Sequence, residues 1–256
     1  MSRRFVPRLT CVLALGLAPP LAAQSVDEIV AKNIAARGGL EKMKAVQSLR
    51  MTGKTTIGPG GEAPLVIELK RPHKARLDIT VQGMTLTQAY DGKDGWVINP
   101  FAGSKSAEPM SPEDLKEAEE QADLDGPLVD WKEKGHKVEL VGKDKVEGTD
   151  AWKLKVTLKN GNIEYIYLDT DSYLDIKTEE KRTVRGTETE TEQTIGDYKE
   201  VSGLMIPHSM EAGAKGRPEK QKITIEKVEV NAPIDDSRFA IPKKEEAPEK
   251  KSGLER

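Results

Sequence analysis

The sequence predicts an α+β protein built on a single strongly curved antiparallel sheet, an incomplete barrel of about ten or eleven strands covered by short helices. Two observations carry this prediction. Short runs of alternating apolar and polar residues recur along the chain, separated by turns that contain glycine, proline or asparagine. Short helical regions interrupt these runs, and no linker or repeat divides the chain, so we expect one domain.

The N-terminal segment, residues 1–23, has the composition of a cleavable secretory signal peptide. Three arginines precede an apolar run that is shorter than the roughly 20 residues needed to cross a bilayer, and small residues follow it. The alternative is a buried core helix. We expect cleavage between Ala23 and Gln24 and export to the periplasm. The only cysteine, Cys11, lies inside the apolar run, so we expect no lipid anchor.

Cleavage would change the chemistry of the chain. It would remove the only cysteine, so we expect neither a disulfide nor thiol chemistry. It would also remove three arginines and leave 37 basic against 43 acidic residues, a formal charge of −6. This balance disfavours nucleic acid or an anionic membrane surface as the main partner. Residues 243–256 are almost entirely charged, so we expect a disordered tail and a folded unit over residues 24–242.

The folded unit is expected to begin with two helices. Residues 26–37 place apolar side chains at helical spacing, carry acidic residues in the first turn, and end at Gly38 and Gly39. A second short amphipathic segment follows over residues 40–46. A first set of strands is then expected over residues 49–96, with turns at residues 58–61, 72–73 and 83, and a hairpin over residues 90–96.

A helical interlude is predicted in the middle of the chain. Ser111 is a suitable helix cap, Pro112 suits the first helical position, and acidic residues follow, so we expect a helix from there to about Ala122. A second helix or helical turn is expected over residues 124–133, closed by Gly135.

The second half is predicted to be nearly all strand. Residues 152–158 alternate apolar side chains with lysine and threonine, so one face is buried and the other is solvated. Asn160-Gly161 is the strongest hairpin turn in the chain. Further strands are expected near residues 138–140 and over residues 163–168, 173–180, 186–198, 204–212 and 222–230. In the last strand the apolar phase slips between Ile225 and Val228, which predicts a β-bulge.

No catalytic or metal-binding motif is recognisable. The three histidines lie far apart beside turns, and no metal-ligand, nucleophile or phosphate-binding motif is present. The aspartates of residues 169–175 resemble a calcium loop superficially, but the required glycine and terminal glutamate are missing, so turn chemistry is favoured. Glu188, Glu190 and Glu192 alternate with threonines, which favours a solvated strand that resists edge-to-edge pairing. We expect no enzymatic activity, no metal and no cofactor.

The remaining candidate for function is an apolar concave surface. A curved sheet that is too open to fill itself with side chains commonly holds a ligand between sheet and helices. The alternative is that the same residues form ordinary core. The candidate lining residues are apolar and come from the predicted strands: Leu49, Met51, Leu77, Ile79, Met84, Leu86, Trp96 and Trp152.

Six short segments spread over residues 26–242 carry a resemblance to a known family. They are residues 36–42 (ARGGLEK), 48–53 (SLRMTG), 90–96 (YDGKDGW), 138–148 (VELVGKDKVEG), 167–174 (YLDTDSYL) and 203–207 (GLMIP). Together they resemble the outer-membrane lipoprotein-sorting proteins of the LolA/LolB-like superfamily. This resemblance implies an incomplete antiparallel barrel closed by a helical lid, with an apolar cavity that takes lipid acyl chains.

The resemblance also implies a function. It points to a soluble, monomeric periplasmic carrier that binds acyl chains of lipoprotein or lipid; the alternative is a non-enzymatic sensing or assembly module that binds an envelope protein. In the soluble carrier of the family an arginine on an early strand forms part of the lid latch, and Arg50 stands near such a place. This chain departs from the better-known carriers in having few aromatic residues: 3 Trp, 5 Tyr and 3 Phe.

Overall fold

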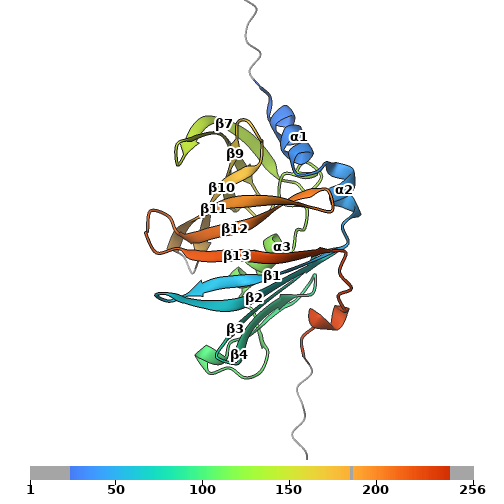
Figure 1. The fold of residues 1–256 in the computed structure, drawn as a ribbon, viewed down its shortest axis with the longest axis vertical. Coiled ribbons are helices and arrows are strands. Elements are labelled where there is room, and N and C mark those ends of the chain that lie inside the picture. The colour runs from blue at the N-terminus through green and yellow to red at the C-terminus, as the bar shows by residue number, and fades with distance from the viewer. Residues whose placement is uncertain (1–23, 185–186, 243–256) are drawn as a thin grey trace, which may run out of the picture.

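The computed structural model describes residues 24–184 and 187–242. The predicted signal peptide (1–23) and charged tail (243–256) lie outside the described residues. The strands form one continuous antiparallel sheet of 13 strands that curves but does not close (Figure 1). The predicted α+β class and curved, incomplete barrel are therefore confirmed.

The strands follow the chain in the order β1 (Ser48–Ile57), β2 (Gly61–Lys70), β3 (Lys74–Val81), β4 (Met84–Tyr90), β5 (Gly95–Ile98), β6 (Glu108–Pro109), β7 (Lys137–Val146), β8 (Thr149–Thr157), β9 (Ile163–Asp169), β10 (Asp175–Val184), β11 (Thr187–Val201), β12 (Leu204–Ala214) and β13 (Gln221–Val230). In space they run β6-β5-β4-β3-β2-β1-β13-β12-β11-β10-β9-β8-β7. Pairing of β1 with β13 joins the two halves of the chain, which leaves β6 and β7 as the edges.

Three α-helices accompany the sheet: α1 (Val26–Ala36), α2 (Leu40–Ala45) and α3 (Pro112–Gln121). Short 3₁₀ turns, η1 (Pro100–Ala102) and η2 (Asp236–Arg238), complete the described elements. Ser111 caps α3, as expected from the sequence, and Ser25 and Glu28 form a reciprocal capping box on α1. No helix within the described ranges is long and apolar enough to cross a membrane.

Three expectations are corrected. The sheet has more strands than the predicted ten or eleven, because the pairing partners β5 and β6 are too short for alternation to reveal them. Of the predicted helix or helical turn over residues 124–133, only turns form and the helix does not, since Pro127 follows Gly126 and Asp130 has a left-handed φ of 51°. The strand with the alternating glutamates, β11, is interior to the sheet, where those carboxylates pair with lysines on its neighbours.

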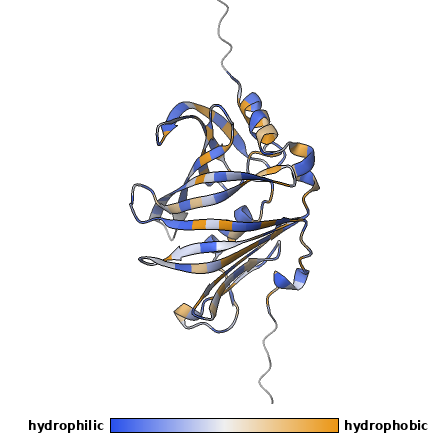
Figure 2. Cartoon of the chain, viewed as in Figure 1, coloured by the Kyte–Doolittle hydropathy of each residue, from blue (hydrophilic) through white to orange (hydrophobic). Residues whose placement is uncertain are grey.

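The sheet has two faces with different chemistry, and hydrophobic and hydrophilic residues alternate along its strands (Figure 2). Directly paired residues point to the same face. Met51, Ile67 and Leu77 form one paired row across β1, β2 and β3, and the neighbouring row is Arg50, Glu68 and Arg76. We call the first the inner face, because α2 and α3 pack against it, and the second the outer face.

The helices contact different parts of the inner face. α1 packs through Ile29 and Val30 on β7, β8 and β9, and α2 packs through Met43 on β1, β12 and β13. α3 packs on Tyr90 at the end of β4 and lies between the two wings of the curved sheet (Figure 1). The inner face is thus covered at intervals and not along its whole length.

The outer face of β1–β5 is covered by residues 231–239, which we call the C-terminal strap. Ser48 Oγ donates to the carbonyl oxygen of Ala232 over 2.6 Å, and Trp96 Nε1 donates to that of Phe239 over 2.7 Å. Beneath the strap, Glu68 is fully buried and accepts from Arg50 at 2.8 Å and from Arg238 at 2.7 Å. Two guanidinium groups compensate for the burial of this carboxylate.

The predicted β-bulge in the last strand is confirmed. Thr52 pairs with Lys227 but Gly53 pairs with Ile225, so Glu226 is the extra residue. The bulge brings the carbonyl oxygen of Thr224 so close to Gly53 that a Cβ at this position would clash with it. Glycine at position 53 therefore allows the backbones of β1 and β13 to approach at the seam of the sheet.

We expect the strap to be a main contributor to stability. Phe239 is fully buried, so Phe239→Ala should lower the free energy of unfolding by about 3–5 kcal/mol through lost packing and a residual cavity. Ile241, which is 54% exposed, is the matched control, and Ile241→Ala should change it by less than about 0.5 kcal/mol. Urea unfolding measures both variants; equal effects would contradict the role assigned to the strap.

Candidate ligand-binding site

The inner face of β1–β4 carries apolar side chains that no helix covers. Leu77 and Ile79 on β3 lie opposite Ile67 and Leu65 on β2, and Ile79 also faces Leu86 on β4. Within the described part of the chain, Ile67, Leu77, Ile79 and Leu86 are half-buried and belong to none of the packed core clusters. We call the half-exposed set the apolar strip: Met51, Ile67, Leu77, Ile79, Met84 and Leu86.

The structure brings six of the eight candidate lining residues to this face. Leu49 and Met51 lie at the α2 end, in partial contact with the core. Leu77, Ile79 and Leu86 occupy the middle, and Met84 lies at the tip of the β3–β4 hairpin, where it is 43% exposed. That a ligand contacts these six residues stays a prediction. Their position on one face and their partial exposure would allow a ligand to reach them.

The two tryptophans lie elsewhere. Trp96 pairs with Ala89 and Ala89 with Arg76, which places it on the outer face, where it is buried against the C-terminal strap. Trp152 lies on β8, in the distant wing of the sheet, packed against the core beneath α1. We therefore leave both out of the apolar strip. Alternation placed Trp96 on a face of its strand but could not tell that this face is the outer one. Trp152 is on the inner face, but on a strand far from β1–β4.

Sequence reasoning missed residues that the fold adds to the same face. Ile67 is the partner of Leu77, and Met210 on β12 and Ile223 on β13 continue the face beyond β1. All three are half-buried. Alternation along β2 marked Ile67 as apolar, but only the pairing of β1 with β13 shows that Met210 and Ile223 join the inner face.

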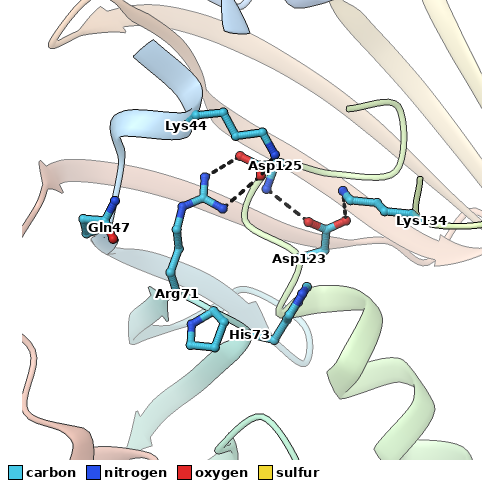
Figure 3. A pocket seen from close by; sticks show the side chains of 8 residues that line it. Lys44, Gln47, Arg71, His73, Asp123, Asp125 and Lys134 are labelled. Atoms are coloured by element: carbon cyan, nitrogen blue, oxygen red, sulfur yellow. Dashed lines mark hydrogen bonds and ion pairs between the residues drawn. The ribbon is translucent and has the colours of Figure 1, made fainter. Parts of the chain in front are cut away.

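A charged pocket of about 490 Å³ lies where β2 ends and β3 begins. It is formed by α2, the turn between β2 and β3, and the segment after α3 (Figure 3). The side chains that line it are mostly ionic: Lys44, Gln47, Arg71, Pro72, His73, Asp123, Asp125 and Lys134.

The centre of this pocket is the buried carboxylate of Asp125. Arg71 donates to both of its oxygens, at 2.6 and 2.9 Å, and Lys44 donates to one at 2.9 Å (Figure 3). The Arg71 side chain also donates to the carbonyl oxygens of Val46 and Met43. Asp123 forms a separate pair with Lys134 at 2.5 Å. We call Arg71, Asp125 and Lys44 the charged clasp.

The charged clasp joins α2, the turn between β2 and β3, and the segment after α3. Its charged groups are paired with one another, so few remain for a ligand. Hydrogen bonds from Arg71 and Lys44 outweigh the effect of burial and lower the pKa of Asp125 to about 2. The same hydrogen bond to Asp125 raises the pKa of Arg71. Because each charge already has its partner, the pocket is suited to holding α2 and the segment after α3 in place, more than to binding an anion.

Two further expectations concern individual polar residues. Arg50 does not latch a helix: its described partner is Glu68 on the outer face, because its position on β1 is one residue out of phase with Met51. The loop of residues 169–175 is a turn, in which Asp169 accepts from the backbone N–H groups of Asp171 and Ser172. Among the residues that the structure describes, no group of three or more His, Cys, Asp or Glu side chains is arranged to hold a metal ion.

Solved structures share this fold over nearly their whole length. A DUF1329 family protein from Desulfovibrio piger aligns with a TM-score of 0.59 at 12% identity, covering 85% of this chain and 98% of that one. A LolA superfamily protein from Nitrosomonas europaea gives 0.57 at 13% identity, with the same coverage of 85% and 98%. A candidate outer membrane lipoprotein-sorting protein domain from Vibrio parahaemolyticus gives 0.56 at 14% identity, covering 83% and 94%.

These similarities establish a LolA-like fold. No family model matches the sequence, and no curated protein sequence matches it either. At identities this low the likeness concerns the architecture of the chain and not its ligand.

The charged clasp should be needed for stability at neutral pH. Asp125→Asn removes the charge that compensates Arg71 and Lys44, so we expect the free energy of unfolding to fall by about 2–4 kcal/mol. Asp94→Asn, at a carboxylate that is 75% exposed, is the matched control and should have little effect. Chemical denaturation at neutral pH compares the two variants.

The same carboxylate should give a defined pH dependence. The pKa of Asp125 lies at about 2 in the folded chain, below its ordinary value of 3.8. Its contribution, about 2 kcal/mol, is therefore complete above pH 3.8 and is lost as the pH falls through about 2. The stability difference between the wild-type protein and Asp125→Asn should shrink over that window, and a constant difference would contradict the assignment.

Proposed function

We propose that this chain, with its LolA-like fold, is a periplasmic carrier that binds the acyl chains of a lipid or lipoprotein on its inner face. The observation that carries the proposal is the apolar strip, a continuous set of half-exposed aliphatic side chains on the face where the helices lie. Side chains of an ordinary core would be packed against other elements, and an ordinary surface would place polar residues among the apolar ones. The apolar strip fits neither description.

The chemistry of the strip suits an alkyl chain. Leucine, isoleucine and methionine side chains offer no hydrogen bonds, so a ligand would be held by burial of apolar surface alone. Each methylene buried contributes about 0.8 kcal/mol, and about ten methylenes would thus give a gross 8 kcal/mol before the losses of binding. Binding of this kind requires no covalent chemistry, which agrees with a sequence that has no catalytic motif.

The proposed location follows from the N-terminal segment. Residues 1–23 have the features of a secretory signal, and the chain carries no cysteine after Cys11 to accept a lipid. Export to the periplasm suits a carrier that moves acylated cargo between membranes. We further propose that it acts as a monomer.

Replacing residues at the centre of the apolar strip should weaken acyl-chain binding. Leu77→Ser and Ile79→Ser each remove about 2 kcal/mol of apolar contact, so the Kd for a fluorescent long-chain fatty acid should rise about 10- to 30-fold. Val141→Ser removes an equally apolar side chain that is 55% exposed on the edge strand β7, and should leave the Kd unchanged. Fluorescence titration measures all three, and equal Kd values would contradict the proposed site.

Native mass spectrometry of protein purified from the periplasm tests the ligand directly. We expect adducts whose masses match lipids or acylated peptides, and an N-terminus at Gln24. Protein that carries no lipid but copurifies with a stoichiometric protein partner would favour a sensing or assembly module. Exclusion of fluorescent fatty acids from the purified chain would overturn the carrier proposal.

A further inference from the structure

α3 is held to the sheet by two unlike contacts. One side of the helix packs on β3 and β4, where Ala118 and Ala122 form a small apolar cluster with Tyr90. The other side faces β10, where Arg182 pairs with Glu117 at 2.8 Å and lies 3.8 Å from Glu120. The helix thus bridges the two wings of the sheet over the inner face (Figure 1), and it has an apolar side and a charged side.

The contact at the charged side of α3 depends on few groups. Glu120 accepts hydrogen bonds from the side chains of Asn160 and Asn162, at 2.6 and 2.7 Å, in the turn between β8 and β9. Arg182 is shared, because it also bonds to Glu180 on its own strand. Between α3 and β10, the described ion pairs all use the guanidinium of Arg182.

Beneath this contact lies an excess of carboxylates. Glu164 on β9 lies directly opposite Glu180 on β10, and both line a cavity of about 10 Å³ together with Glu120 and Arg182. Lys181 also lines the cavity, but it pairs with Glu188 and Glu190 on β11. The charged and titratable groups that act on this corner are Glu117, Glu120, Asp175, Glu180, Lys181 and Arg182, with His136 beyond Glu120.

This environment changes the ionisation of Glu164. Protein atoms surround its side chain on most sides, and this desolvation raises its pKa to about 8, with further contributions from Glu180, Asp175 and Glu120. Burial also raises the pKa of Glu180. Glu164 therefore holds a proton at neutral pH while α3 is in place.

We propose that this corner is a proton-controlled latch. While Glu164 is protonated, α3 stays in place over the inner face. When Glu164 ionises, the side of α3 that carries Glu117 and Glu120 separates from β10. The geometry favours this, because an ionised Glu164 would add a second sheet carboxylate that competes for Arg182. Glu117 and Glu120 would then face like charges with their shared cation withdrawn. Opening this side of α3 would expose the part of the inner face at β9 and β10 that lies beneath it. Only a role for that surface in ligand binding rests on the proposed function; the latch itself does not.

The sign of the effect follows from linkage. Once the charged side of α3 separates from β10, Glu164 becomes more exposed to water and its pKa returns towards 4.5, whereas in the closed state the pKa lies at about 8. The closed state is therefore favoured most at low pH, and the advantage is lost as the pH rises from 4.5 through about 8. Above that range the opening equilibrium should become constant.

Hydrogen exchange measured by mass spectrometry tests the latch on the full-length mature chain without any ligand. After correction for intrinsic exchange rates, we expect the opening constant of the α3 amides to rise at least about tenfold between about pH 5.5 and about pH 8.5. In Glu164→Gln the side chain cannot ionise, so α3 should stay protected across the range. Glu200→Gln, at an exposed carboxylate on β11, should keep the wild-type profile.

The outcomes are distinct. A wild-type profile that is flat with pH, or one that persists in Glu164→Gln, would overturn the latch. Thermal unfolding of each variant distinguishes local opening of α3 from loss of the whole fold. Fatty-acid titration of the same samples is a separate readout, so failure of the carrier proposal would leave the exchange result valid, and the reverse also holds.

Discussion

The arrangement of this protein depends on one buried carboxylate. An open sheet of 13 strands cannot bury the apolar side chains of its own two faces, so other segments must pack on it. Asp125 does this at the helical end: its two oxygens bind Arg71 from the turn after β2 and Lys44 from α2. Because Arg71 also donates to the backbone carbonyl oxygens of Met43 in α2 and of Val46, a single ionic centre sets where α2 and the segment after α3 lie relative to the strands.

The two faces of the sheet differ in how far other segments cover them. On the outer face, the C-terminal strap seals a row that contains Glu68 with its two arginine partners, and Phe239 and Trp96 bury the apolar part. On the inner face, α2 and α3 cover the end of β1–β4 where Leu49 and Tyr90 lie, and they leave the apolar strip half-exposed towards the β3–β4 hairpin. Ion pairs thus hold covering segments on both faces, and the apolar strip has no charged side chain. This arrangement supports the proposed binding of apolar ligands by burial.

Local signals in the sequence predicted local structure well. The cap at Ser111, the Asn160-Gly161 turn and the slipped phase near Ile225 are each short-range signals, and the structure confirms all three. Over residues 124–133, where a helix or a helical turn was expected, the structure forms turns, because apolar spacing alone cannot outweigh the proline and the left-handed Asp130 in this segment. For the candidate site, alternation identified Leu77, Ile79 and Leu86 as facing one way, and pairing in the sheet confirms that they do.

The sequence by itself determined that the chain folds as a curved antiparallel sheet with short helices, because side-chain alternation and turn chemistry are properties of neighbouring residues. The tertiary structure decided which face is inner. It moved Trp96 and Arg50 to the outer face, added Met210 and Ile223 to the inner one, and assembled the charged clasp and the Glu164 corner. These depend on contacts between residues far apart in the chain, whose energies follow from burial and from the charges that the fold brings together, and no spacing in the sequence records them.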